Sequence, residues 1–121
     1  MRLLITDELD DEDMSFDIVK MSTLEFNTEC VHPFIASSNF DEIIIDTDAK
    51  VNLVYVRNLM RVSKVIPRIH GELTMQSVSI LCELYKERAA ELRVLFIRDK
   101  EAFNKIIEEL KQTFQWETFY K

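Results

Sequence analysis

Glycine, proline and cysteine are scarce in this chain of 121 residues, which has one Gly, two Pro and two Cys. Because Gly71 is the single glycine, a glycine-rich loop that cradles phosphates is excluded. Turns that need a positive φ must also be rare. Most connections between elements are therefore expected to use type I turns or helix caps.

Cysteine and histidine are too few and too far apart for most site chemistry. Cys30 and Cys82 give no disulfide framework, and we expect both thiols to be reduced in a cytoplasmic protein. Together with His32 and His70 they form none of the close pairs that bind zinc. Cys30 and His32 would share a face only on a strand, and no oxyanion hole accompanies them. We therefore predict a non-enzymatic protein with no catalytic residues, no cofactor and no metal.

Long hydrophobic runs are also missing. Residues 53–56 form one of the longest, far short of a bilayer span, and the apolar start at residues 3–5 is too short for a signal peptide. The hydrophobic content of 47% suits a packed globule. We expect a single globular domain over residues 1–121 that is cytoplasmic and contacts no membrane, and the oligomeric state stays unknown.

The charged residues are divided unevenly along the chain. Residues 1–50 hold 13 Asp and Glu but only 3 Lys and Arg, a formal net charge of −10, whereas residues 51–121 carry +3. The whole chain carries −7. Such asymmetry bears on partners rather than on fold.

The acids are densest in residues 7–13, where six of seven side chains are Asp or Glu. A calcium loop needs alternating ligands and a Gly at its sharp turn, and this segment has no Gly. It is either a solvated loop or a patch that docks on a basic partner. The candidate partner-binding residues are Asp10, Asp11, Glu12 and Asp13.

Basic residues recur at helical spacing in residues 57–68, and no acid lies between residues 49 and 71. Basic side chains at regular spacing can contact nucleic-acid phosphates. The net charge of −7 and the lack of an aromatic residue on that face argue against this use. Pairing with the acidic half of the chain would explain the pattern equally well. We call these residues the basic stripe: Arg57, Arg61, Lys64 and Arg68.

Hydrophobic patterns predict five strands, at residues 2–6, 16–26, 40–46, 92–97 and 116–120. The three consecutive isoleucines of the third are typical of a central strand covered on both faces. The run from residue 92 to residue 120 then reads as strand, helix, strand with a right-handed crossover.

Three helices are predicted between these strands. The first covers residues 49–66 and ends at Pro67, although its valines favour strand. Thr74 and Asp99 are predicted to cap the second and third helices. We therefore expect an α/β fold, a mixed sheet of about five strands with three helices and an antiparallel N-terminal addition. The alternative is α+β, with residues 50–66 in a hairpin with residues 42–46.

Three short stretches resemble pieces of a response-regulator receiver domain: residues 4–8, residues 44–46 and residues 96–100. The resemblance implies that Asp46 stands at the phosphoacceptor position and Lys100 near the last strand. The chain departs from that pattern because residues 8–16 leave no room for the first helix and no Pro follows Lys100. We do not assign the family.

These patterns predict a small acidic interaction protein, of an inhibitor, immunity or regulatory type, that binds a basic protein surface. The alternative is a nucleic-acid-binding regulator that uses the basic stripe.

Overall fold

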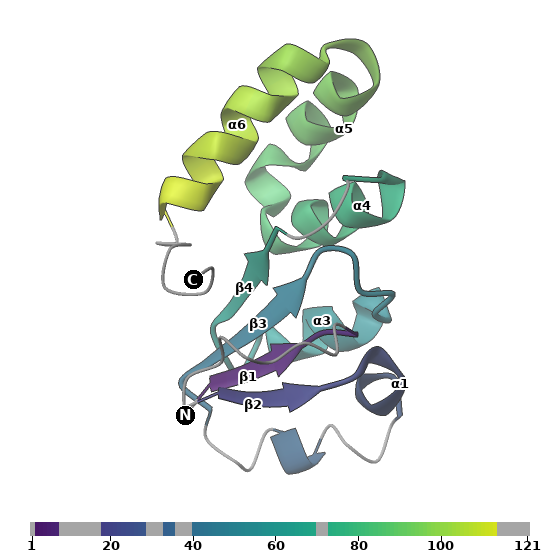
Figure 1. Ribbon diagram of the computed structural model, residues 1–121, viewed down its shortest axis with the longest axis vertical. Coiled ribbons are helices and arrows are strands. Elements are labelled where there is room, and N and C mark those ends of the chain that lie inside the picture. The colour runs from purple at the N-terminus through teal and green to yellow at the C-terminus, as the bar shows by residue number, and fades with distance from the viewer. Residues whose placement is uncertain (1, 8–17, 29–32, 36–39, 70–72, 114–121) are drawn as a thin grey trace.

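The computed structural model (Figure 1) describes residues 2–7, 18–28, 33–35, 40–69 and 73–113. Several predicted features lie outside the described residues. They are the acidic residues Asp10, Asp11, Glu12 and Asp13, the strand at residues 116–120, and Cys30, His32, His70 and Gly71.

Within these described ranges, four parallel strands form the sheet, in the order β2-β1-β3-β4. The strands are β1 (Arg2–Ile5), β2 (Ile18–Met21), β3 (Glu42–Asp46) and β4 (Val65–Arg68). The α/β class is thus correct, but the mixed sheet with antiparallel N-terminal strands is wrong, since β2 pairs with β1 in parallel. The hairpin alternative is also wrong, because β3 and β4 run parallel. Strand direction depends on the path of the connections, which hydrophobic patterns do not encode.

The predicted central strand is confirmed in β3. Ile43, Ile44 and Ile45 are each fully buried. Successive side chains of a strand point to opposite faces. Ile43 and Ile45 accordingly belong to the larger core cluster, whereas Ile44 packs on the other face with Leu4 and Ile66.

The strand predicted over residues 16–26 is only half correct. It ends at Met21, and a short helix α1 (Thr23–Phe26) follows. The Ser22 hydroxyl accepts a hydrogen bond from the Glu25 amide, and the Glu25 carboxylate accepts one from the Ser22 amide. The sequence signature of this capping box is a Ser followed three residues later by Glu. The alternation of apolar residues over the same stretch favoured a continuous strand instead.

The helix predicted over residues 49–66 is shorter than expected. Helix α3 (Leu53–Leu59) begins after the N-cap Asn52, and residues 65–68 form β4. The valines and Ile66 at its end are β-branched and favour strand. Pro67 is accepted because β4 is an edge strand, where a missing amide proton costs little.

Both predicted caps in the second half of the chain are confirmed. Thr74 precedes α4 (Met75–Leu84), and its hydroxyl accepts a hydrogen bond from the Ser77 amide at 3.3 Å. Asp99 precedes α6 (Lys100–Thr113), and its carboxylate accepts one from the Ala102 amide at 3.1 Å.

The strand predicted over residues 92–97 is wrong. These residues lie in α5 (Ala89–Arg98), which follows a 3-10 turn at Lys86–Arg88. Phe96 is therefore not in a central strand. Its ring is half-buried against Phe103 at 5.2 Å between centroids, and the Lys100 ammonium lies 3.6 Å from its centre. A continuous apolar run fits a buried strand and a helix equally well.

Two core clusters meet at α4. One covers a face of the sheet and includes Phe26, Val56 and Ile80. The other lies between α4, α5 and α6 and includes Leu92 and Phe103. These three helices extend from the β4 side of the sheet toward one end of the molecule, away from β2 and α1 (Figure 1). Among the described residues, no helix is long and apolar enough to cross a membrane.

Candidate functional site

The carboxyl edge of the sheet is the place where an open parallel sheet most often binds its ligands. In the order β2-β1-β3-β4, β2 pairs with one side of β1, and the chain then crosses over so that β3 pairs with the other side. The topological switch point therefore lies between β1 and β3. Thr6 follows β1, Asp46 ends β3 and Arg68 ends β4. The strand register places Asp46 beside Arg68.

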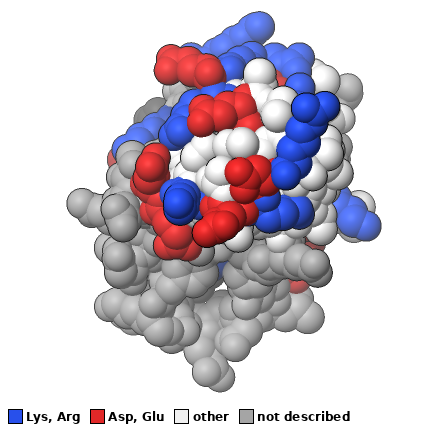
Figure 2. Space-filling model, turned by 90° about the horizontal axis from the view of Figure 1, so that it is seen from above, with Lys and Arg blue, Asp and Glu red and all other residues white. Residues whose placement is uncertain are grey.

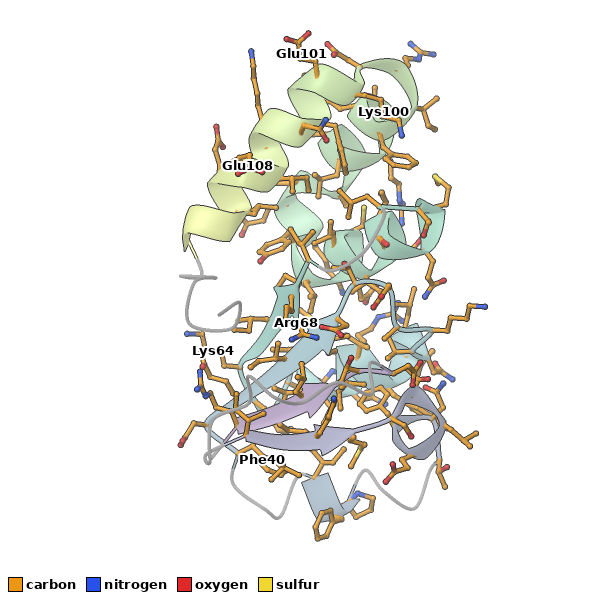
Figure 3. The ribbon with its side chains drawn as sticks, in the orientation of Figure 1. Phe40, Lys64, Arg68, Lys100, Glu101 and Glu108 are labelled. Carbon is orange, nitrogen blue, oxygen red and sulfur yellow. The ribbon has the colours of Figure 1, made fainter. Side chains whose placement is uncertain are left out.

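These three side chains form a buried polar row across the edge. The Arg68 guanidinium donates from Nε to Asp46 Oδ1 at 2.5 Å and from Nη2 to Asp46 Oδ2 at 2.8 Å. The Thr6 hydroxyl also donates to Asp46 Oδ2. Asp46 has no solvent exposure, and Arg68 and Thr6 are exposed by 5% and 3%. Figure 3 shows Arg68 at the end of β4, beside β3.

This geometry gives Asp46 a structural role. A buried charge is tolerated when a partner and hydrogen bonds offset its desolvation, and here both carboxylate oxygens accept bonds. No oxygen of Asp46 faces solvent for phosphoryl transfer or metal binding. Within the described ranges, no group of three His, Cys, Asp or Glu could hold a metal ion. The third stretch of the receiver resemblance lies in helices α5 and α6, not in a strand.

Asp7 fixes the start of the acidic segment at the same edge. Its carboxylate accepts a hydrogen bond from the Thr23 amide at 3.0 Å and one from the Thr23 hydroxyl at 2.6 Å. Asp7 is exposed, and so is Asp48, just after β3. Two exposed acids therefore stand at the carboxyl edge of the sheet, Asp7 after β1 and Asp48 after β3, and the charge of buried Asp46 is offset by Arg68.

The structure distributes the basic stripe over different elements. Arg57 lies on α3, Arg61 and Lys64 on the turn that follows, and Arg68 on β4. Arg57 pairs with Glu83 of α4 at 2.6 Å, and Lys64 pairs with Glu42 at 3.2 Å. Figure 3 shows Lys64 and Arg68 at opposite ends of β4. Arg61 is exposed. The four cations thus form no single helical face.

Pairing with the acidic half of the chain was one of the two alternatives for these cations, and Lys64 and Arg68 do pair with acids of that half. The sequence did not identify the individual acids, because they lie outside the window of residues 49–71. Glu42 and Asp46 come from β3, and Glu83 comes from α4. The parallel pairing of β3 with β4 brings the first two into contact with Lys64 and Arg68. The sequence does contain a signal for these pairs, because Glu42 and Asp46 have the same spacing as Lys64 and Arg68. That signal can be interpreted only when the register of β3 with β4 is known.

The pair between Arg57 and Glu83 predicts a pH dependence. The hydrogen bond from Arg57 lowers the pKa of Glu83, with smaller help from the charges of Arg57 and Lys86. A carboxylate with a lowered folded-state pKa adds stability above its unfolded pKa, about 4.3 for Glu, and loses it as the pH falls through the folded value. Glu83→Gln should therefore unfold more easily than wild type at pH 7. Urea unfolding at pH 7, 4 and 3 should show the gap shrinking, and a gap that persists at pH 3 would exclude the ion pair as its cause.

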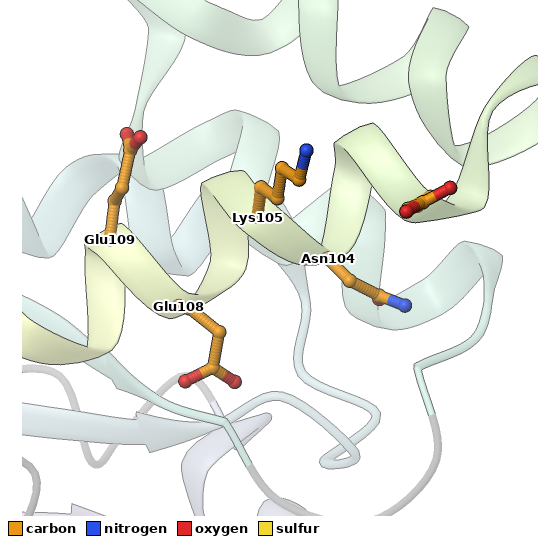
Figure 4. A pocket seen from close by; sticks show the side chains of 5 residues that line it. Asn104, Lys105, Glu108 and Glu109 are labelled. Carbon is orange, nitrogen blue, oxygen red and sulfur yellow. The ribbon is translucent and has the colours of Figure 1, made fainter.

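A second feature, on the exposed face of α6, is a shallow depression of about 500 Å³ (Figure 4). Its lining comes from that helix alone. The lining residues are Glu101, Asn104, Lys105, Glu108 and Glu109. In the close-up their side chains diverge from the helix rather than converge on one point. The feature is a charged helix surface without the enclosed apolar walls of a ligand pocket.

Cys82 offers no reactive thiol. It is buried and free, and its Sγ lies 3.5 Å from the Ala89 carbonyl oxygen. Burial raises the pKa of the Cys82 thiol, the largest of its influences. The nucleophilic form of cysteine is the thiolate, so a protonated, buried thiol is inert.

Comparison with protein-family models, with curated proteins and with solved structures finds no significant match to this chain. Functional inference therefore rests on the residues and their geometry.

Proposed function

We propose that the protein is a small non-catalytic interaction protein, which uses the acidic segment at residues 7–13 to bind a basic surface of a protein partner. Inhibitors, immunity-type proteins and regulators act in this way. Acidic side chains steer a basic partner over long range and favour a correct orientation on contact.

The observation that carries this proposal is the position of Asp7. Its two hydrogen bonds to Thr23 hold the first acid of the segment at the carboxyl edge of the sheet, on the side of β1 that faces β2. Exposed Asp48 stands at the neighbouring strand end. The acidic segment therefore begins on a rigid edge, where a fixed starting point lowers the entropy cost of binding.

The pairing of the basic residues also supports an acidic rather than a basic binding surface. Arg57, Lys64 and Arg68 each form an ion pair with an acid of the same chain. A cation that is already paired gains less from a phosphate, because the existing contact must first be broken. The nucleic-acid alternative remains a prediction.

Two variants of equal net charge test the role of the acidic segment. One carries Asp10→Asn, Asp11→Asn, Glu12→Gln and Asp13→Asn. The control changes four exposed acids to Gln at the helical end: Glu87, Glu101, Glu108 and Glu109. The probe is a fluorescent peptide rich in Lys and Arg, followed by anisotropy.

We expect the first variant to bind the peptide at least about tenfold more weakly than the control, a difference of about 1.4 kcal/mol. Its unfolding free energy should change by no more than about 1 kcal/mol, because exposed charges contribute little to stability. Equal weakening in both variants would show that only net charge attracts the peptide, which contradicts the proposal. A stability loss of several kcal/mol would instead indicate a structural role for these acids.

A further inference from the structure

Helix α5 is apolar on two opposite faces. Leu92 is fully buried in the cluster between α4, α5 and α6, and Leu95 and Phe96 pack beside it. On the other side, Val94 is 52% exposed and Ile97 is 70% exposed. Residues of an α-helix advance by about 100° each, so Val94 and Ile97 are neighbours on one face and Leu92 lies opposite. Val94 and Ile97 therefore form an exposed apolar strip on a helix whose opposite face is already buried.

The charges beside this exposed face are of both signs. Glu91 and Arg98 are exposed and lie seven residues apart, which is about two helical turns, so they occupy the same flank of α5. Val94 and Ile97 lie between them along the helix. Arg88 contacts Glu91 at 3.5 Å, an exposed pair that costs little to rearrange. From the helical end of the molecule, acidic and basic side chains are interspersed around uncharged ones (Figure 2).

On the flank that carries Glu91 and Arg98, the order of charges is self-complementary. When two identical helices pack antiparallel about a two-fold axis, the same flank of each helix faces the other. An acid near the N-terminal end of the helix then lies opposite a base near the C-terminal end of the helix in the second copy. Glu91 would face Arg98 of the second copy, and the reverse contact would repeat by symmetry.

We propose that the exposed face of α5 binds a second copy of this chain in an antiparallel, two-fold dimer centred on Val94 and Ile97. The helix has only ten residues, about 15 Å of length. It can bury less area than a standard stable interface, so the dimer is weak and reversible. This surface is independent of the acidic segment at the carboxyl edge of the sheet.

Sedimentation velocity at about 10 μM and at about 1 mM spans the weak affinities expected. Wild-type protein should shift from monomer toward dimer over this range. Val94→Gln with Ile97→Gln should remain a monomer, whereas Leu24→Gln should behave as wild type, because Leu24 is 82% exposed on α1, outside this interface. Circular dichroism that matches wild type shows that the double variant is folded.

Charge reversal tests the antiparallel arrangement itself. Glu91→Arg alone and Arg98→Glu alone should each weaken self-association, because like charges then meet across the axis. An equimolar mixture of these two single variants should form a heterodimer, since each flank again meets its opposite. A monomer at every concentration overturns the proposal. A dimer that neither reversal affects overturns the proposed packing.

Discussion

Arg68→Ala is expected to lower the free energy of unfolding by about 3–5 kcal/mol, because it leaves the buried carboxylate of Asp46 without its partner. Asp46 is fully buried, and two of its hydrogen bonds come from Arg68. Only the Thr6 hydroxyl would remain as its described donor. Urea unfolding at pH 7, followed by circular dichroism, measures the change.

The matched control replaces both members of the pair by apolar residues of similar size, Asp46→Leu with Arg68→Met. Such replacements of buried ion pairs are often neutral, so the double variant should recover most of the loss. The single variants Asp46→Leu and Arg68→Met complete the double-mutant cycle, and the non-additivity of their losses reports the coupling. If Arg68→Ala costs less than about 1 kcal/mol, the ion pair is not a buried element of the fold.

Ile44→Ala should cost about 2–5 kcal/mol, from lost transfer free energy plus the cavity left at the centre of the sheet. Ile44 is fully buried and packs with Leu4 and Ile66. Ile97→Ala is the control, because the same change at a side chain that is 70% exposed should cost less than about 1 kcal/mol in the monomer. Equal losses at the two positions would contradict the burial that the sheet assigns to Ile44.

The elements that were predicted correctly carry strong local signals. Three β-branched residues between acids identify β3, and Thr74 and Asp99 identify the starts of α4 and α6. Each signal is settled by neighbours in sequence, through a cap or through strand propensity. No tertiary contact is needed to interpret it.

The elements that were predicted wrongly depend on distant contacts. The sequence predicts a strand in place of α5, because the apolar residues of this helix occupy two faces and lack the usual helical period. The sequence also predicts that α3 continues to residue 66, whereas residues 65–68 form β4. A strand that contains Pro67 is tolerated at the edge of the sheet, and the edge position of β4 follows only from the strand order.

The candidate site was predicted in part. The acidic segment was identified from composition, and its anchor at Asp7 and Thr23 came only with the structure. The sequence predicts the basic stripe as one helical face, whereas Arg57, Lys64 and Arg68 pair with acids of β3 and α4. These pairs join residues 22 to 26 positions apart, a separation that helical periodicity does not address.

The central claim, that an acidic surface binds basic protein rather than nucleic acid, is tested most directly by parallel titrations. The wild-type chain is titrated against a labelled peptide rich in Lys and Arg and against labelled duplex DNA, each at low and at physiological salt. We expect the peptide to bind and to weaken with salt, and no duplex complex tighter than about 10 μM at physiological salt, because the net charge of −7 repels phosphates. A sub-micromolar duplex complex that weakens on Arg57→Ala or Arg61→Ala would contradict the account.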